Sequence, residues 1–377
     1  MMTKINIGGD FCVTPNYVSK SLFSEEIKAF FINSDINIVN LECPVIKGSE
    51  AKITKTGPHL YSTEEIFKQL KAINVNAVTL ANNHILDFGE KGLDLTFESC
   101  KNNKISYVGA GSSLSQATVP TIIETNGVRV GLVNFCENEW SVATEKSGGA
   151  NPLDPIDNLN QIKAAREIAD FVLVIVHGGH EFYNLPSPRM LKTYRFFAEN
   201  GADAVIGHHT HCVSGYELHK NVPIFYSLGN MIFTEPVNSD EWYKGAILQL
   251  TLEKGNPIQF ELHPVMQAKE DYKLNLLTDS EKEKVLSEIN NYSDIISNKT
   301  EFENKWEQFI ESKKRTINIF SPLNFVPGRY LQAILYRLGI NKLIMRKQGL
   351  TQILNHIRCE AHRDITFSLL TNTLMKK

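Results

Sequence analysis

Residues 77–93 read AVTLANNHILDFGEKGL, and the fold can be predicted by working outward from this stretch. Its first five residues are apolar or β-branched, which favours a short buried strand. Two asparagines and a histidine follow at once, and residues 89–103 then show the apolar spacing of a helix. The pair Asn82-Asn83 alone is also compatible with an ordinary turn. A strand, a polar segment and a helix in this order are typical of a βαβ unit.

The same order recurs along the first 265 residues. Residues 24–33 and 62–74 begin with Ser or Thr followed by acidic residues, as helices do, and residues 156–168 and 188–200 are further predicted helices. Asn126-Gly127 predicts a hairpin turn, and residues 245–265 predict a second, closing hairpin. We therefore expect an α/β fold with a largely parallel, buried sheet and helices outside stacked sheets. The predicted strands include KINIGGD, INIVNLE, FVLVIVHGG, ADAVIGHH and PIFYSLGN.

The composition and periodicity of the sequence change near residue 270, where charge-rich helical patterns begin. We therefore predict two domains, residues 1–265 and a helical C-terminal extension at 270–377. Within the extension, residues 330–354 place apolar side chains at helical spacing with Arg and Lys between them. Such a basic amphipathic segment can lie on anionic lipid or can pack its apolar face on the main domain. The sequence leaves both alternatives open.

The composition of the chain limits the classes of protein to which it could belong. The 377 residues are 42% hydrophobic and 21% charged, as in globular proteins with a sizeable core. A net charge of -3 argues against a dedicated nucleic-acid binder. The six cysteines form no CxxC pair, and no apolar run reaches the roughly 18 residues that span a bilayer. Together with a start that lacks a signal-peptide pattern, this predicts a cytoplasmic protein with reduced thiols.

Polar side chains follow one predicted strand after another. Taken singly, Asp10 could cap a helix, a lone histidine could be a hydrogen-bonded core residue, and 208–211 could be a surface loop. Ligands of open α/β sheets, however, bind outside the carboxyl ends of the strands. The joint occurrence of these residues therefore favours one shared site. The residues concerned are Asp10, Glu42, Asn82, Asn83, His84, His177, His180, Glu181, His208, His209, His211 and Asn230.

The mixture of imidazole, carboxylate and amide groups suits divalent cations such as Mn, Zn, Fe or Mg. His209 and His211 would share one face of an extended segment, with His208 on the opposite face in a core or supporting role. Asp10 and Glu42 would offset the charge of one or two cations. Two metal ions can activate water and clamp a phosphoryl or acyl oxygen, while His84 could protonate a leaving group.

Several consecutive motifs resemble the bacterial CapA family of poly-γ-glutamate capsule synthesis proteins, which is related to calcineurin-like metallophosphoesterases. The motifs lie between residues 3 and 240 and include GGDFCVT, NLECPV, LANNHILDFGEKGL, VHGGHEF, VIGHHTHCVSGYE and IFYSLGNMIF. The resemblance implies a four-layer α/β-β/α sandwich with a two-metal site. It also implies metal ligands at Asp10, Glu42, Asn83, His177, His209 and His211, catalytic roles for His84, Asp10 and Glu181, and substrate contacts at Asn82, His180 and Asn230.

The chain also departs from the parent phosphoesterases. Their first motif is Asp-x-His, whereas Cys12 stands at the histidine position here, and Glu42 replaces a bridging Asp. Gly178 stands where CapA members often have Trp. These differences leave five or six ligands, enough for one tight metal ion and a second that is weak or absent. Lys55 and Arg189 could contact an anionic substrate, but they are expected to be solvated surface residues.

The first functional hypothesis is a metal-dependent hydrolase of phosphoester or amide bonds in an anionic polymer or peptide-like substrate, linked to capsule or poly-γ-glutamate synthesis. A second keeps the pocket without metal and assigns acid/base chemistry on a peptide or amino-acid derivative to Asp10, Glu42 and the histidines. A third is a non-catalytic assembly factor that contacts a polymer synthase or a membrane surface through its C-terminal helices.

Overall fold

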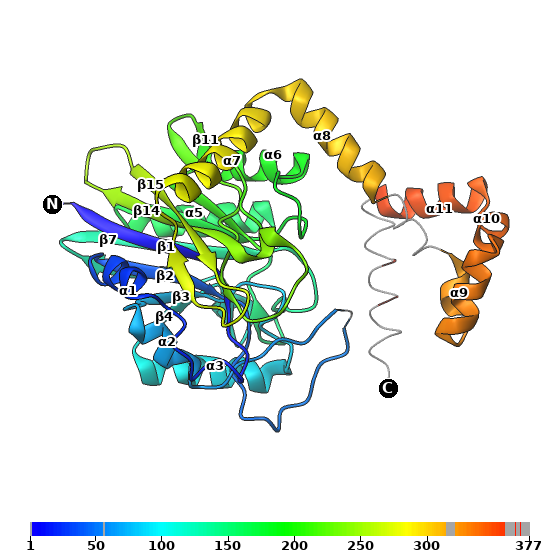
Figure 1. The fold of residues 1–377 in the computed structure, drawn as a ribbon, viewed down its shortest axis with the longest axis horizontal. Coiled ribbons are helices and arrows are strands. Elements are labelled where there is room, and N and C mark those ends of the chain that lie inside the picture. The colour runs from blue at the N-terminus through cyan, green and yellow to red at the C-terminus, as the bar shows by residue number, and fades with distance from the viewer. Residues whose placement is uncertain (1, 56, 314–320, 359–365, 367–369, 371–377) are drawn as a thin grey trace. The chain divides into compact units, whose positions relative to one another are not determined.

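The computed structural model describes residues 2–55, 57–313, 321–358, 366 and 370. The chain divides into two compact units, Met1–Phe302 and Glu303–Lys377 (Figure 1).

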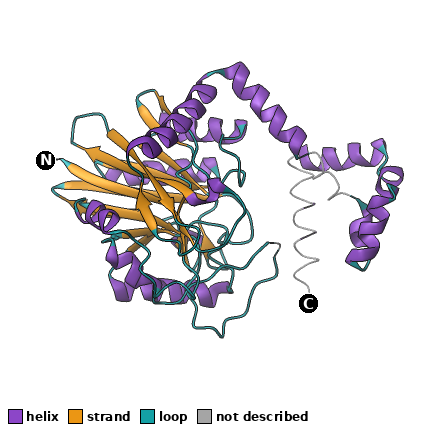
Figure 2. Ribbon diagram, in the orientation of Figure 1, coloured by secondary structure: helices purple, strands orange, loops and turns teal. Residues whose placement is uncertain are grey.

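Two large β-sheets form the first unit (Figure 2). In the first sheet β1 lies near the middle, and the parallel strands β2 and β13 flank the residues at its carboxyl end. The strands of this sheet, in spatial order, are β16 (Leu274–Leu276), β15 (Gln259–Gln267), β14 (Lys244–Leu252), β1 (Thr3–Cys12), β2 (Ile36–Leu41), β3 (Ala77–Thr79) and β4 (Ser106–Val108), with β13 (Asn230–Phe233) beside the end of β1.

The second sheet has parallel strands in its middle and a hairpin at each edge. The predicted turn at Asn126-Gly127 is confirmed, because both residues have positive φ and join paired strands. In spatial order the strands are β11 (Tyr216–His219), β12 (Val222–Phe225), β10 (Ala204–His208), β9 (Phe171–His177), β7 (Val128–Cys136) and β6 (Thr121–Thr125), and β5 (Ala110–Gly111) pairs separately with β8 (Gly149–Ala150).

The two sheets pack face to face, and helices cover their outer faces. Ile7 and Ile38 of the first sheet share one buried core with Leu132 and Ile175 of the second. Burying each such side chain contributes about 1.5–3 kcal/mol. Helices α1, α2 and α3 bury their apolar faces against the first sheet, and α5 and α6 against the second. The predicted four-layer sandwich is confirmed. The helices of this unit are α1 (Glu25–Ile32), α2 (Ile66–Ala72), α3 (Gly89–Asn103), α4 (Leu114–Ala117), α5 (Pro155–Ile168), α6 (Pro188–Glu199), η1 (Asp240–Tyr243) and α7 (Asp279–Ser297).

The first unit continues beyond the boundary expected at residues 265–270. Strand β16 pairs with β15, so the first sheet gains an edge strand after that point. Helix α7 follows and buries Val285 and Ile289 in the core between the sheets. The charged residues of this helix form its solvent-exposed face, whereas its few apolar residues pack it against the sandwich.

The described residues of the second unit are mainly helical. They comprise most of α8 (Lys299–Ser312), followed by η3 (Pro322–Phe325), α9 (Arg329–Arg337), α10 (Ile340–Ile344) and α11 (Lys347–Arg358). Among the helices that the structure describes, none has the length and apolarity needed to cross a bilayer.

Candidate metal centre

The six predicted ligands meet at the carboxyl ends of the strands. Asp10 lies at the end of β1, in register with Asn40 of β2 on one side and Asn230 of β13 on the other. Glu42 follows β2, Asn83 follows β3, and His177 is the last residue of β9. His209 and His211 follow β10. All six side chains are at most 8% exposed. Among the described residues, two sets of ligand atoms lie within 4.8 Å of one another; they are Glu42, His177, His209 and Asp10, Glu42, His211.

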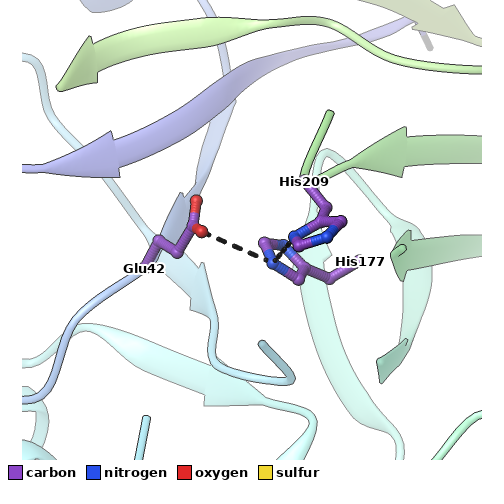
Figure 3. Close-up of side chains that lie close together, drawn as sticks. All are labelled: Glu42, His177 and His209. Atoms are coloured by element: carbon purple, nitrogen blue, oxygen red, sulfur yellow. Dashed lines mark hydrogen bonds and ion pairs between the residues drawn. The ribbon is translucent and has the colours of Figure 1, made fainter. Parts of the chain in front are cut away.

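The first set is centred on His177 (Figure 3). Its Nε2 atom lies 3.0 Å from His209 Nδ1, 3.0 Å from Asn83 Oδ1 and 3.5 Å from Glu42 Oε1. Ligands about 2.0–2.2 Å from one ion are separated by roughly 3.0–3.5 Å in octahedral or tetrahedral geometry. The observed spacings are compatible with groups that share a cation.

The second set joins Asp10, His211 and the same glutamate. His211 Nδ1 lies 3.4 Å from Asp10 Oδ2, and its Nε2 lies 3.7 Å from Glu42 Oε1. Asn230 Oδ1 is 2.9 Å from His211 Nδ1 and orients the ring. Because Glu42 belongs to both sets, it could contribute to the binding of a cation in either of them.

Glu42 provides the test of whether a cation fits. Its carboxylate is fully buried, and neither oxygen has a hydrogen-bond partner. Burial raises the pKa of Glu42 well above its ordinary value, and the negative charges of Asp10 and Glu181 raise it further. A buried anion that lacks donors is strongly disfavoured unless a cation compensates it. The residues present therefore fit a divalent metal ion.

Asp10 is held differently. Its Oδ1 accepts a hydrogen bond from Asn40 Nδ2 at 2.7 Å, and its Oδ2 accepts one from the backbone N–H of His209 at 3.0 Å. Burial raises the pKa of Asp10, but the hydrogen bond to His211 and the charges of His208 and His211 outweigh it, so the pKa lies below its usual range. Asn40 also lies 3.1 Å from His177 Nδ1 and links the two sets. Its position two residues before Glu42 on a strand is the signal that could have identified it.

Burial favours the neutral form of three histidines at the centre. Burial lowers the pKa of His177 well below its ordinary value, with a further contribution from nearby His209. Burial also lowers the pKa of His209 and His208. In His211 burial is outweighed by the hydrogen bond to Asp10, so its pKa is raised. Neutral imidazole is the form that binds metal ions.

His84 is oriented by two residues that the sequence did not identify as functional. Its Nδ1 lies 2.7 Å from Asp87 Oδ2, and Lys55 pairs with the other oxygen of Asp87. The carboxylate accepts the Nδ1–H, which leaves Nε2 to exchange protons. Burial lowers the pKa of His84, whereas Asp87 opposes that shift. The His-x-x-Asp spacing within LANNHILDFG is the signal that could have indicated Asp87.

The expectation that Lys55 is a solvated surface residue is wrong. Its side chain is 3% exposed and lies 3.2 Å from His84 Nδ1, in addition to its ion pair with Asp87. The loop around it is fixed by the same carboxylate, because Leu60 N donates to Asp87 Oδ2 at 2.7 Å. Arg189 does lie at the surface, with a side chain 60% exposed and paired with Glu137.

The extended His-x-His geometry is also corrected. Strand β10 ends at His208, and His209 and His211 adopt left-handed backbone conformations with φ of 89° and 55°. A tight loop, rather than strand alternation, therefore brings the two rings to within 6.1 Å of each other. His208 is buried and its Nδ1 lies 3.5 Å from Asp10 Oδ1.

Cys12 does not occupy a ligand position. It belongs to neither set of ligand atoms among the described residues. The neighbouring Cys43 thiol, together with burial, raises the pKa of Cys12 well above its ordinary value. The centre therefore lacks the imidazole that an Asp-x-His motif would supply, and the Cys12 thiol does not replace it.

The remaining predicted residues divide between the buried framework and the surface. The Asn82 side chain donates to Leu41 O and accepts from His84 N, so it fixes the loop that carries His84. Asn230 is buried and donates to Trp242 O while it orients His211. Glu181 and His180 are exposed in the turn after β9. Glu181 is still close enough to raise the pKa of Glu42 by its charge.

Comparison with known proteins places this centre in a family. The 5'-nucleotidase of Candida albicans SC5314 superposes with a TM-score of 0.42 and 13% identity, covering 77% of this chain and 58% of that one. The capsule biosynthesis protein CapA of Bacillus anthracis is 33% identical over 217 residues, which are 55% of this chain and 53% of that protein. The PGA biosynthesis protein CapA of Bacillus subtilis (strain 168) is 31% identical over 259 residues, 67% of each chain.

The chain thus spans about half to two thirds of the length of these relatives. The model of the family described as bacterial capsule synthesis protein PGA_cap matches residues 4–235. The matched segment includes all six residues of the centre. The chain belongs to the PGA_cap family of bacterial capsule synthesis proteins.

Proposed function

We propose that this chain is a metal-dependent hydrolase that cleaves a phosphoester or amide bond during synthesis of a capsule or poly-γ-glutamate-type polymer. The observation that carries the proposal is Glu42, whose two buried oxygens lack donors and which belongs to both sets of ligand atoms. The polymer class comes from the family and from the names of the Bacillus relatives.

Each residue of the centre has a distinct task in this proposal. Glu42, His177 and His209, with Asn83, would hold one divalent cation, and Asp10, Glu42 and His211 would hold a second. Bound cations would supply Lewis-acid stabilisation of a developing oxyanion and would lower the pKa of a water molecule. Mn, Zn, Fe and Mg all suit this donor set.

His84 would deliver a proton to the leaving group from Nε2. Asp87 fixes the ring through Nδ1 and stabilises the protonated form, as a carboxylate does behind a catalytic histidine. Lys55 neutralises the second oxygen of Asp87 and holds the loop above it. Asp87 and Lys55 are therefore positioning residues, and of these three residues His84 would touch the substrate.

Glu181 is assigned to the mouth of the site. It is exposed, and its charge raises the pKa of Glu42 and of His211, which supports a position at the entrance to the centre. We assign to Glu181 a contact with a cationic or hydrogen-donating part of the substrate, and His180 lies next to it in the same exposed turn.

The experiment measures bound metals in the purified chain and then hydrolysis of chromogenic phosphoesters and γ-glutamyl amides. His209→Ala should lose metal and activity, since His209 contributes to the first set. His219→Ala is the matched control, because His219 pairs with Glu199 outside the centre. Unchanged metal content and activity in His209→Ala would refute the proposal.

Chelation separates this reaction from the metal-independent alternative. The hydrogen-bonded pair of Asp87 and His84 can transfer a proton without a cation. This pair is the observation that favours the alternative, acid/base chemistry on a peptide or amino-acid derivative. Hydrolysis that survives complete removal of metal would support that alternative. A non-catalytic assembly role would be supported if His84→Ala left polymer synthesis unchanged in cells.

A further inference from the structure

The second unit carries an unusual charge distribution. Between Ser312 and Cys359 the sequence contains nine Lys and Arg residues and no Asp or Glu, in a chain whose net charge is -3. A basic block of this kind favours anionic partners. The block lies outside residues 4–235, which match the family, so the family does not account for it.

Helix α9 within this block exposes large apolar side chains. The exposed fractions are 89% for Tyr330, 52% for Ile334 and 68% for Leu338, which directly follows the helix, and no residue of α9 is buried. At 100° per residue these three side chains and Leu331 fall within an arc of about 100° on one face. Arg337 lies at the edge of that arc, where its stem can follow the apolar face while its head group reaches outward.

Helix α11 repeats the arrangement. Leu350, Ile353, Leu354 and Ile357 follow the i, i+3, i+4, i+7 spacing, and Leu354 and Ile357 are both 50% exposed. Arg346 and Lys347 stand at its start, and Leu343 of α10 is 74% exposed just before them. Soluble domains seldom leave so many large apolar side chains uncovered, which indicates that a partner covers them.

We propose that α9 and α11 form a docking surface for an anionic lipid bilayer, with their apolar faces inserted at the interface and their basic residues at the head groups. The combination of exposed Leu and Ile with an acid-free basic block is what such a surface requires. Phosphate binding alone would require the basic residues but not the exposed leucines. Amphipathic helices of this kind lie in the plane of the interface.

Sedimentation of the full chain with lipid vesicles tests the proposal. The chain should pellet with vesicles of phosphatidylcholine mixed with phosphatidylglycerol, but not with phosphatidylcholine alone, and added salt should weaken the binding. Arg337→Gln and Arg346→Gln should each lower the partition coefficient about fivefold, the equivalent of about 1 kcal/mol. The double variant Ile334→Glu/Leu338→Glu should abolish binding.

Ile156→Glu is the matched control, because Ile156 is 77% exposed on α5 of the first unit. It should bind vesicles as the wild type does. Equal pelleting with and without phosphatidylglycerol, or an equal loss in Ile156→Glu, would overturn the proposal. The thermal melting of Ile334→Glu/Leu338→Glu provides the second readout. A large drop in melting temperature, or insolubility, would mean that the apolar face packs on protein and would also overturn it.

Discussion

Glu42 Oε1 lies 3.5 Å from His177 Nε2, yet neither oxygen of this buried carboxylate has a hydrogen-bond partner. A carboxylate in such surroundings costs several kcal/mol unless a cation compensates it. We therefore predict that Glu42→Gln raises the melting temperature of the metal-free protein, since the amide removes the uncompensated charge. Added Mn²⁺ should stabilise the wild type through ligand binding to the folded state but should not stabilise the variant.

Calorimetry of chelated and metal-loaded samples measures both effects. Glu50→Gln is the control, because Glu50 bonds only backbone N–H groups and the Ser49 hydroxyl in an exposed turn. Equal stabilisation of wild type and Glu42→Gln by Mn²⁺ would remove Glu42 from the centre.

Lys55 and Asp87 should behave as one unit. Removing either member leaves a buried charge unpaired, so Lys55→Met should destabilise the fold by about 3–5 kcal/mol. Asp87→Asn should also release His84 and lower kcat more than it changes KM. The loss should not exceed that of His84→Ala, for which a factor of about 10² to 10⁴ is expected.

Urea unfolding of both single variants and of Lys55→Met/Asp87→Asn forms a double-mutant cycle. The double variant should be less destabilised than the sum of the two single variants, because it contains no unpaired charge. Strict additivity would show that the two residues do not interact in solution.

Gly9 precedes Asp10 where β1 meets the loop before β13. A Cβ at this position would lie 1.9 Å from the carbonyl oxygen of Gly229, which is backbone and cannot move aside alone. Gly9→Ala should therefore shift the end of β1, lower stability by about 1–3 kcal/mol or more, and weaken metal binding through Asp10. Gly349→Ala, in open space on α11, should leave metal binding unchanged. Metal titration and thermal melting of the two variants provide the comparison.

Strand ends and helices were predictable because they depend on local patterns. The run AVTLA, the Ser24 cap and the Asn126-Gly127 turn each act within a few residues, and the structure contains the corresponding strand, helix and hairpin. The proximity of Asp10 and Glu42 could also be predicted, since parallel strands deliver their carboxyl ends to one edge of a sheet. His177 ends β9 of the second sheet and joins them through the packing of the two sheets.

What the sequence missed depends on contacts between distant residues. Lys55 lies in a loop without periodicity, and its burial follows from Asp87, thirty-two positions away. The left-handed turns at His209 and His211 reflect tertiary packing around Asp10, since positive φ is uncommon for any residue other than Gly and two such residues in one short loop are not set by local preference. The attachment of α7 rests on a few apolar residues within a charged pattern, which is too weak a signal to place a domain boundary.

Arg195, Glu217 and Tyr226 form a network that should make stability depend on acidic pH. Arg195 donates two hydrogen bonds to Glu217, at 2.8 and 2.7 Å, and the Tyr226 hydroxyl donates at 2.5 Å. Burial raises the pKa of Glu217, but the bonds from Arg195 and Tyr226 outweigh it, so the folded-state pKa lies below the ordinary value of 4.5. The stabilisation is therefore fully present above that value and is lost as the pH falls through the folded-state pKa.

Melting curves of the wild type and Glu217→Gln across acidic and neutral pH test the direction of this pH dependence. The wild type should melt higher at neutral pH by a constant margin, and the margin should shrink once the pH falls below about 4.5. Glu199→Gln is the matched control, because Glu199 binds His219 and Lys220 at the surface and its ion pairs are worth little. A margin that grew toward acid would mean that Glu217 is protonated more readily in the folded protein, contrary to its position beside Arg195.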